Sequence, residues 1–249
     1  MTIFARDSRI IFDLGMNNGD DTDYYLKRGF DVVALEANPV LCARAAERFA
    51  EPVARSQLSI VHAAIWEQSG RTDFLVNIDN DHWSSIDPGW AGRDDSTCER
   101  IDVRCVTLPE LFDEYGVPYY LKIDVEGVDH VVLDQLQGLP QLPACVSVED
   151  CRFGFDYMRT LSACGYDGFK LLDQSTVEGR VDPQTGHVFP AASSGPLGSD
   201  IEGDWLSYDA IVDYYATTVR DHEGNRLAPR TQWWDIHCTR LKDRGLPNV

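Results

Sequence analysis

The sequence of 249 residues has no apolar run of membrane-spanning length and no apolar leader ahead of its first strand-like run. Basic residues are scarce: 22 Lys and Arg stand against 41 Asp and Glu, a net charge of −19, with no basic cluster to offset it. Polyanion binding requires phosphate neutralisation, so this balance disfavours nucleic acids and anionic membranes as partners. We expect a cytoplasmic protein that acts on a neutral or cationic small molecule.

Patterns typical of zinc sites and disulfide frameworks are also missing. The seven cysteines form no C-x-x-C pair, and the six histidines form no H-x-x-x-H pair. We therefore expect reduced, buried thiols and no zinc site. The sequence sets no oligomeric state, and a homo-oligomer stays open.

What is present is an alternation of strand-like and helix-like segments with short connections. It predicts an α/β fold in one domain, residues 1–249, with a doubly wound, mostly parallel sheet. The predicted strands are 9–14, 31–36, 58–63, 119–124, 145–150 and 168–172, and the predicted helices are 20–28, 39–50, 127–137 and 154–164.

Two longer segments interrupt the alternation. Short strands near 72–76 and 101–106 frame a loop, 77–100, which we expect over the carboxyl edge of the sheet. Residues 174–232 form an insertion with a short helix near 207–219, ahead of a last strand near 232–238. Long insertions of this kind often build substrate lids, so we expect a lid here.

The segment 10–21 reads as a buried strand, a glycine-containing turn and the start of a helix, and a second strand ends at Glu36. This is the opening of a nucleotide-type cofactor site, with Glu36 placed to accept hydrogen bonds from ribose hydroxyls. Asn17 replaces the middle glycine of the G-x-G-x-x-G pattern, and Asp20 and Asp21 stand where a pyrophosphate would bind. Carboxylates there repel phosphate and favour a cation, so S-adenosylmethionine fits better than NAD.

A second motif, KIDVEG at 122–127, ends an apolar strand at Asp124 and turns directly into a helix. Asp124 should lie beside the first strand at the ligand-binding edge of the sheet. It would act as a general base, or, with Glu126 and Glu149, as an oxygen ligand of a divalent cation such as Mg²⁺. The simpler alternative is that Asp124 only caps the next helix. His82 and His187, in segments predicted to cover the site, are alternative bases.

Together, these segments resemble the FkbM-type S-adenosylmethionine-dependent methyltransferases over residues 9–172. The resemblance rests on FDLGMNNGD, VVALEANP, VHAAIWEQSGRTDFLV, VTLPELFDEYGVPYYLKIDVEGVD and CVSVED in this order. It implies the Rossmann-like class I methyltransferase fold, with seven strands of which the last is antiparallel. It also implies O-methylation of a small molecule, a sugar, glycoconjugate or polyketide-type metabolite.

The resemblance also assigns roles to individual positions. Asp124 would face the sulfonium, Glu36 would hold the ribose, and Asn38 would lie nearby. The methionine end of the cofactor would be surrounded by Asp13, Gly15, Asn17 and Gly19, and the adenine would lie beside Ala63 and Ala64. The turn departs from the family pattern at Met16 and Asn18.

Two other classes share parts of the pattern. A nucleotide-dependent oxidoreductase or epimerase would have the same opening, but the glycine pattern and a Tyr-x-x-x-Lys pair at a helical site are missing. A non-catalytic protein that binds S-adenosylmethionine would have the same fold without turnover.

Overall fold

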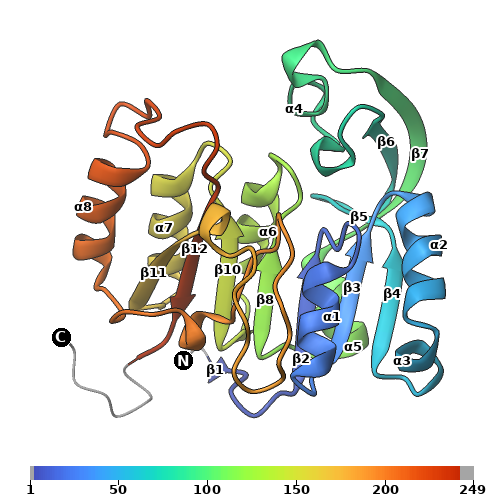
Figure 1. Ribbon diagram of the computed structural model, residues 1–249, viewed down its shortest axis with the longest axis horizontal. Helices are drawn as coiled ribbons and strands as arrows, with labels where there is room; N and C mark the ends of the chain where they lie inside the picture. Colours follow the sequence, from blue (N-terminus) through green and yellow to red (C-terminus); the bar gives the residue numbers. More distant parts are fainter. Residues whose placement is uncertain (1–2, 242–249) are drawn as a thin grey trace.

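The computed structural model describes residues 3–241, which fold around a seven-stranded sheet (Figure 1). The strand order is β11-β12-β10-β8-β2-β3-β4. Both pairings of β12 are antiparallel, and the other four pairings are parallel. The strands are β2 (Ile10–Leu14), β3 (Asp31–Glu36), β4 (Leu58–His62), β8 (Tyr120–Ile123), β10 (Cys145–Glu149), β11 (Gly168–Asp173) and β12 (Trp234–Thr239). This arrangement confirms the predicted doubly wound sheet with an antiparallel last strand.

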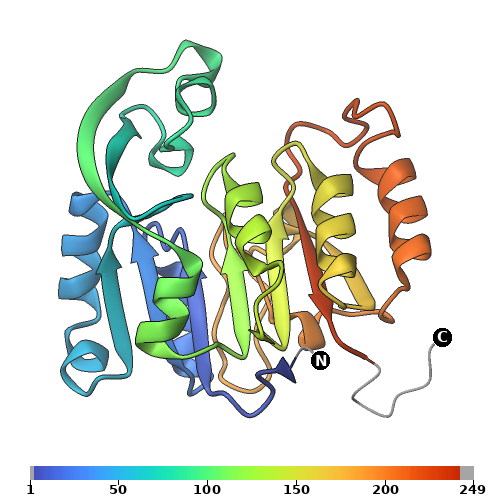
Figure 2. The same cartoon turned by 180° about the vertical axis from the view of Figure 1, so that it is seen from behind.

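Helices pack on both faces because successive side chains of each strand point to opposite sides. Along β2, Phe12 and Leu14 belong to one apolar cluster, whereas Ile11 belongs to the other. The first cluster holds α5 (Leu108–Tyr115), α6 (Asp129–Leu136), α7 (Gly154–Ala163) and α8 (Tyr208–Thr218) against the sheet, on the face turned to the viewer in Figure 2.

The opposite face carries α1 (Asp20–Lys27) and α2 (Pro39–Arg48), followed by α3 (Ala50–Ala54). Beside α1 the first part of the insertion, residues 174–201, takes the place of a helix, and four of its apolar side chains complete the core there: Val177, Phe189, Leu197 and Ile201. Arg28 of α1 forms ion pairs with Asp182 and Asp200 of the insertion, at 3.2 and 2.6 Å. The insertion is therefore part of the packed body.

An arm, residues 70–106, rises above the carboxyl edge of the sheet (Figures 1 and 2). It consists of β6 (Gly70–Asn77), a short helix α4 (Pro88–Ala91) and β7 (Cys98–Val106). β7 pairs with β6 antiparallel and with β5 (Ala64–Ile65) parallel, so the arm is rooted beside β4. The predicted position of the 77–100 loop over the sheet edge is confirmed.

Helix α5 was not among the helices predicted from the sequence. Its start carries a capping box, in which the Thr107 hydroxyl accepts from the Glu110 N–H and the Glu110 carboxylate accepts from the Thr107 N–H. The Thr-x-x-Glu spacing at 107–110 was the signal that could have revealed it. At the other end of the sheet, a two-stranded pair joins β1 (Ile3–Phe4) to β9 (Gln141–Leu142). Within residues 3–241 no helix is long and apolar enough to span a bilayer.

Candidate active site

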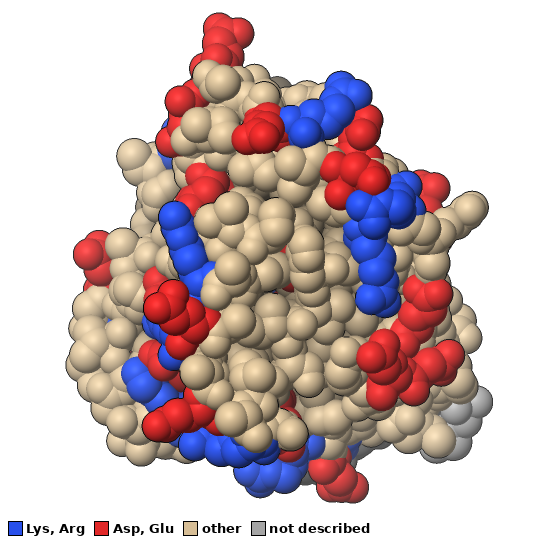
Figure 3. Space-filling view, turned by 90° about the vertical axis from the view of Figure 1, so that its right-hand side faces the viewer, with Lys and Arg blue, Asp and Glu red and all other residues tan. Residues whose placement is uncertain are grey.

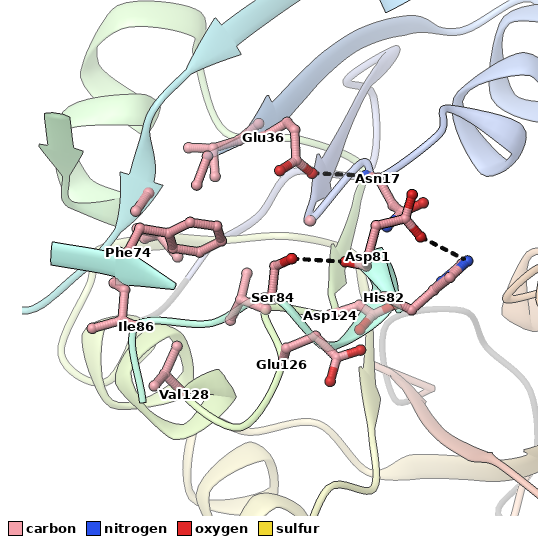
Figure 4. A pocket seen from close by; sticks show the side chains of 16 residues that line it. Asn17, Glu36, Phe74, Asp81, His82, Ser84, Ile86, Asp124, Glu126 and Val128 are labelled. Carbon is pink, nitrogen blue, oxygen red and sulfur yellow. Dashed lines mark hydrogen bonds and ion pairs between the residues drawn. The ribbon is translucent and has the colours of Figure 1, made fainter. Parts of the chain in front are cut away.

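A pocket opens where β2, β3 and β8 end and the arm bends over them (Figure 4). It encloses about 580 Å³ of space that is continuous with solvent. Its lining residues are Gly15, Asn17, Leu35, Glu36, Ala37, Ala64, Ile65, Phe74, Asp81, His82, Ser84, Ile86, Asp124, Val125, Glu126 and Val128.

The turn after β2 brings the backbone against the end of β8. Gly15 has a φ of +82°, and a Cβ at this position would lie 1.7 Å from the carbonyl oxygen of Asp124. Only glycine combines that conformation with so close an approach. The N–H groups of Gly15 and Met16 donate to the Leu35 carbonyl, which fixes the turn on β3 as well.

Glu36, at the end of β3, is buried and reaches across the pocket to the same turn (Figure 4). Its Oε2 accepts from the backbone N–H of Asn17 at 2.9 Å, and its Oε1 accepts from that of Asn38 at 2.7 Å. Burial raises the pKa of Glu36 to about 7, although the Asn38 and Asn17 N–H groups lower it. The Ala37 N–H lowers this pKa as well, so three backbone donors approach the carboxylate, and its remaining capacity can accept a hydrogen bond from a ligand.

One end of the pocket is apolar and the other is acidic. Apolar side chains from the arm and the start of α6 form the first end: Phe74, Ile86 and Val128. Ala64, which also lines the pocket, belongs to the same apolar cluster as Phe74. The second end presents Asp81, Asp124 and Glu126. A ligand with a flat apolar group and a positive charge would therefore have a counterpart at each end.

Carboxyl groups concentrate at the acidic end. Within the described chain, Asp124, Glu126 and Glu149 place one oxygen each within 4.8 Å of one another. Burial raises the pKa of Glu126 to about 8, with the charge of Asp124 adding to the effect and Arg93 opposing it. Burial, together with Asp124 and Glu126, raises the pKa of Glu149 well above its usual range. The cluster can thus hold protons near neutral pH.

The arm is fastened to this cluster through Glu126. The Trp90 indole N–H donates to Glu126 Oε2 at 2.5 Å, and the Arg93 guanidinium lies 3.1 Å from the same oxygen. Ser85 donates to the Glu126 carbonyl at 2.6 Å. Glu126 has a φ of +53°, an uncommon conformation for a residue with a side chain. Three contacts from the arm therefore hold Glu126 in a strained backbone conformation next to Asp124.

Of the predicted cofactor residues, Gly15, Asn17, Glu36, Ala64 and Asp124 line the pocket. The other four lie behind it. Asp13 and Ala63 are fully buried, Asn38 caps α2 and donates its backbone N–H to Glu36, and Gly19 packs on the Phe49 ring. Of the predicted catalytic residues, Asp124, Glu126 and His82 all line the pocket, and Glu149 joins the first two from β10. His187 instead is buried against α1, near Lys27 and Asp23.

The interpretation of Asp20 and Asp21 was wrong. Asp20 pairs with Arg48 at 2.8 Å, and Asp21 is buried under the insertion, where it accepts from Ser193 and from the Ser194 N–H. Neither side chain lines the pocket, because the first turn of α1 points them away from it. The acidic end that favours a cation is built by residues after β8 and by the arm.

The insertion contributes no residue to the lining of this pocket, and its role as a lid stays a prediction. The cover comes from the arm, through Asp81, His82, Ser84 and Ile86.

The sequence reasoning also missed Lys122. Its ammonium lies 3.3 Å from Asp13, 3.5 Å from Asp21 and 3.4 Å from Asp124. Burial alone would lower the pKa of Lys122, but these carboxylates raise it well above its usual range.

Among curated proteins, none matches this chain in sequence. Among solved structures, a precorrin-6y C5,15-methyltransferase from Geobacter metallireducens GS-15 is 11% identical, with 92% of this chain and 78% of that chain covered and a TM-score of 0.39. A SAM-dependent methyltransferase from Archaeoglobus fulgidus is 9% identical, with coverages of 95% and 88% and a TM-score of 0.39. The geranyl diphosphate C-methyltransferase from Streptomyces coelicolor A3(2), solved with Mg²⁺, geranyl diphosphate and S-adenosyl-L-homocysteine, is 10% identical, with coverages of 96% and 74% and a TM-score of 0.39.

The strand order, the glycine turn and the acidic residue at the end of β3, taken with a family-model match, define an S-adenosylmethionine-dependent methyltransferase of class I fold. The matching model is that of the methyltransferase FkbM domain, and it covers residues 13–167, more than half of the chain. The chain belongs to this family.

The residues present fit S-adenosylmethionine. The Glu36 carboxylate suits a ribose hydroxyl as donor, and the apolar end beside Ala64 and Phe74 suits a flat adenine. The carboxylates around Asp124 suit a sulfonium charge at the other end.

Proposed function

We propose that this methyltransferase transfers the methyl group to a hydroxyl oxygen of a neutral small molecule, such as a sugar, a glycoconjugate or a polyketide-type metabolite. The observation that carries the proposal is the cluster of Asp124, Glu126 and Glu149 at the acidic end of the pocket. An alcohol must lose its proton as it attacks, and a positioned carboxylate is a suitable acceptor for that proton.

The residues divide this work according to their surroundings. Asp124, whose side chain is 27% exposed and lies 3.4 Å from the Lys122 ammonium, is the general base. Glu126, with a pKa of about 8, is mostly protonated at neutral pH and donates a hydrogen bond that orients the acceptor. When bound, S-adenosylmethionine supplies a methyl group activated by its sulfonium. The pocket walls hold the hydroxyl in line with that group and exclude water, which accounts for most of the rate gain.

Two variants of this mechanism remain as alternatives. His82 lines the pocket with its side chain 43% exposed, so its imidazole is a second candidate for the base. The three clustered carboxyl groups would also suit a divalent cation such as Mg²⁺, which would lower the pKa of the acceptor hydroxyl. The first alternative predicts that His82→Ala loses activity, and the second predicts that chelation with EDTA does. These results separate both from the Asp124 mechanism.

The distribution of charge supports a small, uncharged acceptor. The chain carries a net charge of −19, and on the face seen in Figure 3 the Lys and Arg side chains are scattered among Asp and Glu. Such a surface repels nucleic acids and anionic membranes. We also propose a cytoplasmic location.

Three other predictions remain untested. They are that residues 1–249 form a single domain, that the insertion serves as a lid, and that the protein forms a homo-oligomer.

The test is an assay with S-adenosylmethionine against a panel of sugars, glycosides and hydroxylated polyketides, with products identified by mass spectrometry and NMR. A methoxy product supports the proposal, and methylation on carbon or nitrogen contradicts it. Binding of the cofactor without turnover on any acceptor favours a non-catalytic role. The same assay with NADH excludes or reveals the oxidoreductase alternative.

Variants then assign the base. We expect Asp124→Asn to lower kcat by about 100-fold or more while S-adenosylhomocysteine affinity changes by only a few-fold. His82→Ala tests the alternative base, because the imidazole shares the pocket with Asp124. If His82→Ala loses activity and Asp124→Asn keeps it, His82 is the general base and Asp124 is not.

A further inference from the structure

Lys122 is an unusual residue for its position in the middle of the sheet. It lies on β8 with strands on both sides, and only 3% of the residue is exposed. Burying an ammonium is costly unless ion pairs and hydrogen bonds compensate it. The contacts that compensate it come from three separate parts of the chain.

Lys122 lies between the cofactor turn and the acidic end of the pocket. Its ammonium donates to the Gly15 carbonyl at 3.2 Å and lies 3.3 Å from Asp13 Oδ1, so it is tied to β2 and to the first residue of the turn that follows. It also lies 3.4 Å from Asp124 Oδ2. One cation thus fixes the distance between the backbone that meets the cofactor and the carboxylate that meets the acceptor.

The insertion completes this arrangement from the other side. Asp21 Oδ2 lies 3.5 Å from the Lys122 ammonium, and Asp21 Oδ1 accepts from the Ser193 hydroxyl at 2.6 Å and from the Ser194 N–H at 3.1 Å. Both serines are buried. These donors offset part of the Asp21 charge, which would otherwise draw the ammonium away from Asp124.

We propose that Lys122 is a positioning residue for methyl transfer: it holds Asp124 in a fixed place relative to the Gly15 turn, and Ser193 of the insertion keeps Lys122 there through Asp21. The insertion, which is absent from the pocket lining, would then act on the reaction from beneath the site. The effect of Lys122 on turnover rests on the role proposed for Asp124, whereas its effect on cofactor binding does not.

The first test compares two buried lysines on the same face of the sheet. Lys122→Met should weaken S-adenosylhomocysteine binding by about tenfold, because Gly15 and Asp13 lose their cation. It should also lower kcat by about 100-fold with a smaller change in the acceptor KM, because Asp124 is displaced. Lys122→Arg should recover part of both.

Lys170→Met is the control, because Lys170 is also buried but bonds to the Ile201 carbonyl instead of a carboxylate. It should lose stability without a change of more than about threefold in affinity or kcat. Equal effects of Lys122→Met and Lys170→Met on affinity and kcat would overturn the proposal. Near-UV circular dichroism shows whether each variant is folded.

A second test remains decisive for the proposal even if the Lys122→Met variant does not fold. Ser193→Ala removes the hydroxyl that donates to Asp21, whereas Ser194→Ala retains its bond because the donor is the backbone N–H. Ser193→Ala should lower kcat by about threefold or more and Ser194→Ala should not. If the two serine variants have the same kcat, the link through Asp21 is wrong.

Failure of the proposed function gives a different result. If the methylated atom is not oxygen, the kcat comparisons are repeated with the acceptor that is found. If no acceptor is found, titration of Lys122→Met and Lys170→Met with S-adenosylhomocysteine still tests whether Lys122 positions the Gly15 turn. Unchanged binding in Lys122→Met refutes that role.

Discussion

Glu36 should make cofactor binding depend on pH in a direction that can be calculated. Its carboxyl is buried, and its pKa lies at about 7. With that pKa, about a tenth of the carboxyl groups are ionised at pH 6 and about nine-tenths at pH 8. The ribose hydroxyls of the cofactor are donors and prefer the ionised form. We therefore expect S-adenosylhomocysteine to bind about tenfold more tightly at pH 8 than at pH 6.

The variant Glu36→Gln isolates this effect. The amide keeps one acceptor for the Asn17 or Asn38 N–H and leaves the other N–H facing an NH₂ group, so both protein and ligand lose a charge-assisted bond. A lost bond of this kind costs about 1.5–3 kcal/mol, which corresponds to about 10- to 100-fold weaker binding at pH 8. The pH dependence should largely disappear in the variant.

Stability provides an independent measurement of the same group. The folded protein holds the Glu36 proton up to a pH of about 7, whereas the unfolded chain releases it near the ordinary pKa of 4.5. The stability that this difference contributes is fully present below 4.5 and is lost as the pH rises to about 7. Thermal unfolding of the wild type should therefore shift downward across that interval more than that of Glu36→Gln. The reasoning would be refuted if the affinity for S-adenosylhomocysteine, measured by calorimetry, changed equally with pH in the wild type and in Glu36→Gln.

Three further predictions concern the same pocket. Gly15→Ala should abolish S-adenosylhomocysteine binding and lower the melting temperature, because its Cβ would collide with the Asp124 carbonyl; calorimetry that shows unchanged binding would contradict the geometry. Trp90→Phe removes the indole donor to Glu126 and should lower kcat by about tenfold at most, since Arg93 remains; stopped assays with the wild type as reference measure this. Chelation with EDTA should leave turnover unchanged if the carboxyl cluster works without a cation, and a loss restored by Mg²⁺ would select the metal-assisted mechanism.

The positions at the strand ends that line the pocket were largely predictable from local sequence. Gly15, Glu36 and Asp124 each end or follow a strand, and parallel strands bring their carboxyl ends to one edge. The alternation of apolar segments therefore placed them together without any knowledge of packing. The missed helix α5 was also encoded locally, in the capping box at Thr107 and Glu110.

The direction of side chains was less predictable. Asp20 and Asp21 stand beside the turn in the sequence, but the first turn of α1 rotates them toward Arg48 and Ser193, which are distant along the chain. The arm reaches Glu126 from the far side of the pocket through Trp90 and Arg93. No local sequence pattern predicts these long-range contacts.

The sequence by itself determined the order of strands and helices, the glycine turn and the carboxylates at the strand ends, because backbone sterics and the period of apolar residues act over a few neighbours. The tertiary structure alone decided which buried charges meet. Lys122 meets Asp13 and Asp21 only because α1, β2 and β8 pack side by side. The cost of burying an unpaired charge makes such meetings a property of the whole fold.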